Sequence, residues 1–523
     1  MSTPRTVRRA LLAATLATSL APAISPASAQ SLRIGVASEA TSLDPHFYDL
    51  TPNMEVAKHL FSSLTRMSPS GELLPDLAAS WTNIDPTTWE VILRPGAAFH
   101  DGTAVTAEDV VFSFERARSV PGSPSSFRWY LQDLSAVEVM DPLRLRLRTA
   151  APAPLLMHSL RAVAILSRAA SANATTADYD SGTAVIGTGP YRLVSRSRGS
   201  AIVLERNEGY FGEKPEWRSV TIRPIVNNGA RTAALLAGDV DVINFVSGGD
   251  IDTLRERDNV RLSSAPGVRL YYLGLDVGRT VSPHVTDARG QPLPANPLQD
   301  VRVRRAMSLA IDRAGLAERL LHGQAVPTVY PALRPQPAVP PADLTAARRL
   351  LQEAGYAGGF ELALAGPNNR YPFDAQVLQA VSQMWTRIGI RTRVDAMPSA
   401  VYFSRAARHE FSATFSGSLS SRGEVLTQLQ RMLQTPDAQR GVGTGNWGRF
   451  SDPETDTLIE TAAVTIDEVA RNEWLHRLAE RAITDRQAII PLYFPVNTWG
   501  TRTGIAYRVR DDEYTLAADA VSQ

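Results

Sequence analysis

The chain has 523 residues, of which 44% are hydrophobic and 20% charged, and its formal net charge is +1. This composition is typical of a globular protein long enough for two or three domains. The near-neutral charge argues against a nucleic-acid-binding function.

The N-terminus has the pattern of an export signal. Three arginines form a basic start, residues 10–23 are a short Ala/Leu-rich run, and Ala27-Ser28-Ala29 is a small-x-small cleavage site. We expect residues 1–29 to be removed, which leaves 51 basic and 53 acidic residues and a net charge of −2. The pair Arg8-Arg9 leaves twin-arginine export open beside the general route.

The chain contains no cysteine. Exported proteins can form disulfides, but a core of this size does not require them. The absence also excludes a lipid-anchored cysteine, and no later stretch is apolar enough to span a bilayer. We therefore expect a soluble periplasmic protein.

The first half of the mature chain predicts a strand at residues 31–37, a helix at 53–64 and a short helix within Leu73–Trp81. Trp89–Arg116 then predicts a half-buried strand (WEVIL), turns containing Pro and Gly, and a helix. Thr106 is the expected N-cap of that helix, with Asp109 as its acidic partner. Residues 135–149 alternate as two strands around a turn.

The order of residues in this stretch resembles the signature of the periplasmic solute-binding proteins of dipeptide, oligopeptide and nickel ABC transporters. In that family a strand ending in Leu-Arg leads into Gly-x-x-Phe-His-Asp-Gly and then Ala-x-Asp-Val-x-Phe-Ser. The matching residues are Leu93, Arg94, Gly96, Phe99, His100, Asp101, Gly102, Ala107, Asp109, Val110, Phe112 and Ser113.

Further motifs of the same family follow in order. The run LLPDLAASW precedes the signature, and Gly187-Thr188-Gly189-Pro190-Tyr191, which has the chemistry of a structural turn, comes after it. Asp300-Val-Arg-Val-Arg-Arg-Ala306 and Ala310-Ile-Asp-Arg313 form a second strong match. The resemblance therefore covers nearly the whole mature chain.

The second half of the chain alternates between predicted helices and strands. A helix ends at Gly238, and Tyr271–Leu275 is an apolar strand. Later helices are expected at 343–355, 374–388, 400–409, 424–434, 453–466 and 468–486, and strands at 360–365, 390–394, 411–416 and 489–494. This βαβαβ order indicates an open α/β sheet.

The resemblance implies an α/β periplasmic binding protein fold of type II, in its large three-part variety, with a hinge between two lobes. The implied large lobe is residues 30–275 plus 490–523, with an inserted subdomain at about 46–186. The implied second lobe is residues 276–489.

The sequence gives no positive evidence for catalysis. Its eight histidines show no HxH, HxxxH or HExxH spacing, and GxSxG and Walker motifs are absent. We expect no enzyme activity, no cofactor and no metal site. A secreted hydrolase is the alternative from another functional class.

Three loops are candidates for ligand binding, because pocket residues of open α/β folds lie at strand C-termini. The first is Thr41-Ser42-Leu43. The second is Asn368-Asn369-Arg370-Tyr371, in which Arg370 falls where dipeptide-binding relatives place an arginine that holds the ligand carboxylate. A guanidinium pairs bidentately with a carboxylate, which suits that role.

The third loop, Gly417–Glu424, departs from the peptide-binding pattern. Ser418 stands where relatives have a tryptophan, and Ser421 stands at the first acidic place. Glu424 falls near a second acidic position, with Arg422 beside it. The residue that holds a ligand amine is therefore left open, and Trp447 completes the predicted ligand-binding set.

The resemblance implies the solute-binding component of an ABC importer, which captures a small solute by hinge closure and delivers it to the permease. We expect a di- or oligopeptide, with a nickel chelate, an opine or an oligosaccharide as alternatives on the same fold. A chemoreceptor-coupled sensor would share this sequence. We expect a monomer with no nucleic-acid partner and no membrane insertion after removal of the signal.

Overall fold

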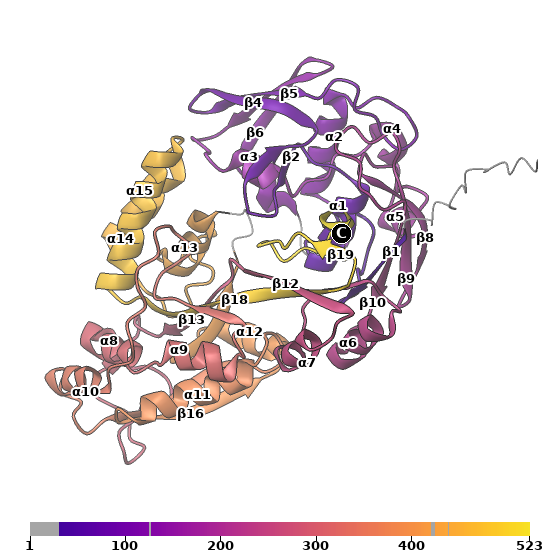
Figure 1. The fold of residues 1–523 in the computed structure, drawn as a ribbon. Coiled ribbons are helices and arrows are strands. Elements are labelled where there is room, and N and C mark those ends of the chain that lie inside the picture. Colours follow the sequence, from indigo (N-terminus) through magenta and orange to yellow (C-terminus); the bar gives the residue numbers. More distant parts are fainter. Residues whose placement is uncertain (1–30, 125–126, 420–423, 438) are drawn as a thin grey trace, which may run out of the picture.

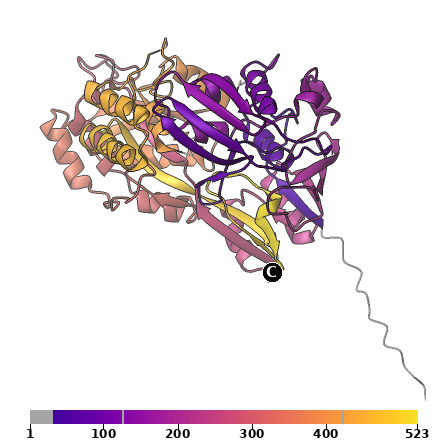
Figure 2. The same cartoon turned by 90° about the horizontal axis from the view of Figure 1, so that it is seen from above.

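The computed structural model describes residues 31–523 except 125–126, 420–423 and 438. The predicted export signal, Ser421 and Arg422 lie outside the described residues. The protein has two lobes, seen from two directions in Figures 1 and 2. We call the lobe that contains the first strand the first lobe.

The first lobe contains the N-terminal strand and the C-terminal segment. Its strands are β1 Ser31–Val36, β8 Tyr191–Ser197, β9 Ala201–Arg206, β10 Ser219–Pro224, β11 Val242–Ile243, β12 Val260–Pro266, β19 Ile505–Tyr507 and β20 Ala520–Ser522. Its helices are α1 Thr51–Leu60, α4 Arg168–Ser171, α5 Thr176–Asp180, α6 Asn228–Ala237 and α7 Ile251–Arg255. β1 pairs in parallel with β10 on one side and β11 on the other, so it lies inside its sheet.

An antiparallel unit is inserted into the first lobe. Its elements are β2 Thr65–Met67, β3 Leu73–Pro75, β4 Ala78–Asp85, β5 Thr88–Leu93, α2 Ala107–Arg118, β6 Leu134–Asp141, β7 Arg144–Thr149 and α3 Leu156–Leu160. Four strands form a sheet in the order β4-β5-β7-β6. One face of this sheet packs with α2 and α3 into a core of its own.

The second lobe is the part of the chain in which helices and strands alternate. Its strands are β13 Leu270–Leu275, β14 Ala325–Pro327, β15 Phe360–Pro367, β16 Ile390–Met397 and β17 Ala413–Ser418. Its helices are α8 Val301–Leu309, α9 Arg313–Gly315, α10 Leu344–Glu353, α11 Asp374–Thr386, α12 Ser399–Ala407, α13 Val425–Leu433, α14 Pro453–Val464 and α15 Glu468–Ala479. β15 pairs in parallel with both β16 and β17, which is the open α/β arrangement that the sequence predicts.

A single long strand, β18 (Ile489–Arg502), belongs to both lobes. Its first half pairs with β13 and β14, and its second half pairs with β12 and β11. Figure 1 shows it as the yellow ribbon that runs from one lobe to the other. The predicted strand at 489–494 is therefore only the first part of a strand that joins the lobes.

The signature stretch Trp89–Arg116 folds as predicted. Residues 88–93 form β5, and Thr106 and Asp109 form a capping box at the start of α2. The short helix expected within Leu73–Trp81 is wrong, because these residues form β3 and the start of β4. Ser80 and Trp81 pair with Ile92 and Val91 of β5, so pairing to the neighbouring strand overrides the local helical pattern.

His100 joins the signature stretch to the turn at residues 187–191. The N–H of Gly187 donates to its Nδ1 (3.3 Å), and its Nε2–H donates to the carbonyl oxygen of Gly189 (3.2 Å). A Cβ at Gly187 or Gly189 would collide with the backbone of Leu60. Close packing against Leu60 therefore requires glycine at both positions of the turn. Both ring nitrogens of His100 are used in hydrogen bonds to this turn.

Candidate functional site

Two of the three predicted loops meet in the second lobe. The hydroxyl of Tyr371 accepts a hydrogen bond from the N–H of Gly417 (3.1 Å), and the Tyr371 ring packs edge-on against Tyr271 of β13 (5.0 Å between ring centres). β15 and β17 are parallel neighbours, so the loops that follow them leave the same edge of the sheet. This edge is next to the start of β13, where the chain passes from β12 of the first lobe into the second lobe; we call this place the crossing.

Arg370 presents its side chain at this edge. Its guanidinium carbon lies 5.4 Å from the centre of the Tyr371 ring, and its backbone N–H donates to Oδ2 of Asp374 (2.9 Å). Within the described residues the guanidinium has no carboxylate partner, and the residue is exposed. Asn368 and Asn369 are also exposed, and Oδ1 of Asn369 accepts from the N–H of Ser399 (2.8 Å).

The described ends of the third loop differ in their environment. The Oγ atom of Ser418 is buried and has no hydrogen-bond partner within the described part of the chain. Glu424 accepts a hydrogen bond at Oε1 from Nη2 of Arg471 (3.0 Å). Burial raises the pKa of Glu424, and the charge of Arg471 opposes this. The carboxylate is therefore engaged in an internal ion pair.

Trp447 packs into the second lobe. Its ring lies edge-on to Tyr402 (5.9 Å between ring centres) and also contacts Phe403, and its carbonyl oxygen is 3.1 Å from Nδ1 of His409. These contacts belong to a small aromatic cluster beside β15.

The first predicted loop is fixed to the first lobe. Ser42 Oγ and the Leu43 N–H both donate to Oδ1 of Asp180 (2.8 Å each), and the Thr41 N–H donates to Oδ1 of Asn53 (2.8 Å). Thr41 is exposed, whereas Ser42 and Leu43 are buried. Among the described residues, no hydrogen bond connects this loop to Tyr371 or Gly417.

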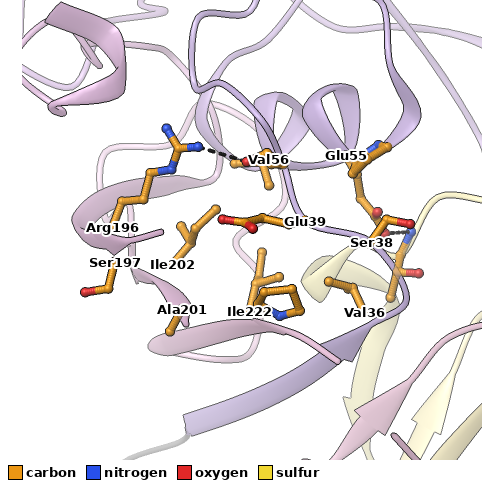
Figure 3. A pocket seen from close by; sticks show the side chains of 14 residues that line it. Val36, Ser38, Glu39, Glu55, Val56, Arg196, Ser197, Ala201, Ile202 and Ile222 are labelled. Atoms are coloured by element: carbon orange, nitrogen blue, oxygen red, sulfur yellow. Dashed lines mark hydrogen bonds between the residues drawn. The ribbon is translucent and has the colours of Figure 1, made fainter. Parts of the chain in front are cut away.

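A small cavity lies beside this loop, at the carboxyl end of β1 (Figure 3). Its volume is about 20 Å³, which is enough for one water molecule. Glu55 lines it, and burial raises the pKa of this carboxyl to about 8. The cavity is too small for a peptide ligand.

A larger pocket of about 700 Å³ lies in the second lobe, between α8 and a proline-rich segment. Several of its polar side chains already have partners. Arg313 donates to the carbonyl oxygens of Pro491 (2.8 Å) and Ser308 (3.1 Å), and Nε2 of His476 bonds the carbonyl oxygen of Arg334 (3.0 Å). The pocket is formed by this lobe alone.

An ion pair at the crossing was not predicted from the sequence. Arg269, just before β13, donates from Nη2 to Oε2 of Glu513 (3.1 Å) and from Nε to Oε1 (3.3 Å), and both side chains are mostly buried. Glu513 belongs to the C-terminal segment of the first lobe and has a left-handed backbone (φ 70°), which is costly outside glycine. The acidic run Asp511-Asp512-Glu513 was the available sequence signal.

The lobes also contact each other away from the crossing. Leu155, at the N-terminus of α3, is buried in the hydrophobic cluster of α13, α14 and α15. Ile466, between α14 and α15, packs in turn against the core of the inserted unit. Nη1 of Arg471 donates to the carbonyl oxygen of Ile466 (3.1 Å), so the Arg471–Glu424 pair supports this second contact.

Within the described residues, no three His, Cys, Asp or Glu side chains are grouped so that they could hold a metal ion. No helix in the same residues has the length and apolar character that crossing a bilayer requires.

Comparison with known proteins gives consistent matches. The family described as "Bacterial extracellular solute-binding proteins, family 5 Middle" matches residues 72–439. The glutathione-binding protein GsiB of Pectobacterium atrosepticum is 27% identical over 500 residues, which cover 91% of each chain.

Solved structures agree in fold. HbpA2 from Haemophilus parasuis superposes with a TM-score of 0.81 at 22% identity and covers 94% of this chain and 100% of its own. The unliganded open form of the periplasmic murein tripeptide-binding protein MppA gives a TM-score of 0.79 at 23% identity and covers 95% of this chain and 98% of its own.

Proposed function

The chain belongs to family 5 of the bacterial extracellular solute-binding proteins, and we propose that its solute is a short peptide with more carboxylates than amines, such as glutathione. The protein is the solute-binding component of an ABC importer and works with the permease subunits of that importer. Its lobes are expected to close on the solute, and the closed form docks on the permease.

The ligand class is inferred from which charged side chains near the place where the lobes meet have partners. The guanidinium of Arg370 is exposed without a carboxylate partner among the described residues. The carboxylates nearby are engaged, since Glu424 bonds Arg471, Glu513 bonds Arg269, and Asp374 accepts three backbone N–H groups. A ligand with surplus carboxylate complements this arrangement.

Relatives support the same class. Glutathione is a tripeptide with two free carboxylates and one amine, and GsiB is named as its binding protein. MppA is named for a murein tripeptide. We place the ligand between the loops at Thr41–Leu43 and Asn368–Tyr371 and the end of β17 at Ser418.

The remaining assignments belong to this proposal. We propose that the lobes divide just before β13 (Leu270–Leu275) and within β18 (Ile489–Arg502), a few residues from the expected positions 275 and 490, and that residues 1–29 direct export to the periplasm. The protein binds and releases its solute without catalysing a reaction on it.

Native mass spectrometry of the purified mature chain, followed by calorimetric titration, tests the proposal. The titrated panel contains glutathione, trialanine, an opine, a sugar and a nickel–histidine complex. We expect glutathione to bind most tightly, and its diamide to bind at least tenfold more weakly. Tight binding of an opine or sugar with no peptide binding would overturn the ligand class.

A further inference from the structure

Lys58 is one of only two lysines in the chain, beside Lys214. It lies near the C-terminal end of α1, and its side chain is partly buried. Its Nζ is 5.3 Å from the centre of the Tyr514 ring. Within the described residues, no carboxylate pairs with this ammonium and no group accepts a hydrogen bond from it.

The surroundings of Lys58 make the missing acceptor costly. Burial lowers the pKa of Lys58 to about 8, the positive charge of Arg161 lowers it further, and Asp512 opposes this. Asp512 is occupied by Arg510, which donates to both of its oxygens (2.6 and 2.8 Å). Asp76 and Asp49 also act on Lys58; Asp76 accepts the N–H of Ser63 (3.1 Å), and Asp49 accepts the hydroxyl of Tyr130 (2.9 Å). A contact with one aromatic ring is a weaker partner for the ammonium than a carboxylate would be.

The position of Lys58 is fixed on both sides of it along α1. Oε1 of Glu55 accepts the N–H of Thr515, and Nε2 of His59 accepts the N–H of Ala517. These bonds hold the C-terminal segment against α1, with Tyr514 beside the ammonium. α1 is therefore rigid where it presents Lys58.

Lys58 is close to two segments of the first lobe that contact the second lobe. Tyr514 directly follows Glu513, which pairs with Arg269 at the crossing. Arg161, the other neighbour, is the C-cap of α3, and the N-cap of α3 is Leu155, which is buried in the second lobe. Lys58 thus lies beside the segments of the first lobe that carry these two contacts.

We propose that Lys58 is a carboxylate anchor of the ligand site: it binds one carboxylate of the peptide from the first lobe, while Arg370 binds the other from the second lobe. This inference rests on the proposed function, since it requires a ligand with two carboxylates. A ligand held by a cation of each lobe bridges them, and this bridging favours the closed form.

Amine labelling of the full mature chain tests the inference directly. An amine-reactive ester is applied with and without saturating S-methylglutathione, which carries the same carboxylates and no free thiol, and modified peptides are quantified by mass spectrometry. We expect labelling of Lys58 to fall at least tenfold with the peptide. Lys214 is exposed, 3.8 Å from Glu208, and its unchanged labelling corrects for reagent consumed by the peptide amine.

Substituted proteins and amidated ligands distinguish direct contact between Lys58 and the peptide from shielding of Lys58 when the lobes close. Lys58→Met should weaken S-methylglutathione at least tenfold, and Lys214→Met should not. Amidating one of the two carboxylates should weaken binding to the wild type and have little effect on Lys58→Met. The inference is overturned if Lys58 labels equally with and without peptide, or if Lys58→Met binds like the wild type. If the wild type binds no carboxylate peptide, the proposed function fails instead.

Discussion

Arg269 and Glu513 connect the strand that enters the second lobe to the C-terminal segment of the first, with 3.1 Å between Nη2 and Oε2. The pair is mostly buried, and Glu513 has a left-handed backbone (φ 70°). The pair therefore links the two lobes at the crossing.

Removing one partner of this pair should be more harmful than removing both. Glu513→Gln leaves the Arg269 guanidinium buried without its counter-ion, and we expect a loss of about 3–5 kcal/mol in the free energy of unfolding. The double variant Arg269→Met/Glu513→Met should recover much of that loss. Urea denaturation of the two single variants and the double variant measures the effect, and additive losses would contradict it.

Arg370→Ala should weaken the peptide ligand without changing the fold. A charged hydrogen bond lost from an enclosed site costs about 2–4 kcal/mol, which is about 30-fold or more in affinity. Arg349→Ala is the matched control, because Arg349 is an exposed arginine that pairs with Glu353 on α10. Calorimetry that gives equal affinities for both variants would exclude Arg370 from the site.

The contact of Leu155 with the second lobe should control the closed form. Leu155→Ala removes a side chain buried in the α13–α15 cluster, a change that costs about 2–5 kcal/mol in a packed core. We expect a larger radius of gyration by small-angle scattering and weaker ligand binding. Val469→Ala, at a side chain that is 71% exposed, should leave both unchanged.

Glu55 should make stability depend on pH in an unusual direction. Burial raises its pKa to about 8, so the folded protein binds a proton that the unfolded chain releases above about pH 4.5. The contribution of protonated Glu55 to the free energy of unfolding is complete below about pH 4.5. It is lost as the pH rises through 8, which lowers the free energy of unfolding by up to about 5 kcal/mol.

Glu55→Gln keeps an oxygen acceptor for the Thr515 N–H and removes the titration. Relative to this variant, the wild type should lose stability between pH 5 and pH 8.5 in urea denaturation. A difference that stays constant over this range would show that Glu55 ionises normally.

Local patterns predicted much of the fold because their causes are local. The Thr106–Asp109 capping box spans three residues, and Gly238 ends α6 with the left-handed backbone that glycine favours. The two predicted loops after β15 and β17 meet because parallel neighbouring strands bring their ends together.

Local patterns did not predict contacts between residues that are far apart in the sequence. Arg269 and Glu513 are 244 positions apart, and Lys58 lies within a plain amphipathic helix. Glu424 was predicted near an amine-binding position, but its partner Arg471 is 47 residues away and follows a helix cap. Such pairings depend on how the lobes pack, and one sequence does not carry that information.

The bonds from Glu55 and His59 to the N–H groups of Thr515 and Ala517 also set an order of assembly. The helix that starts the first lobe is completed by residues about 460 positions later in the chain. During synthesis, this lobe cannot reach its final form until the last segment has left the ribosome. The first lobe therefore stays incompletely folded while the segment that contains Thr515 and Ala517 is still being synthesised.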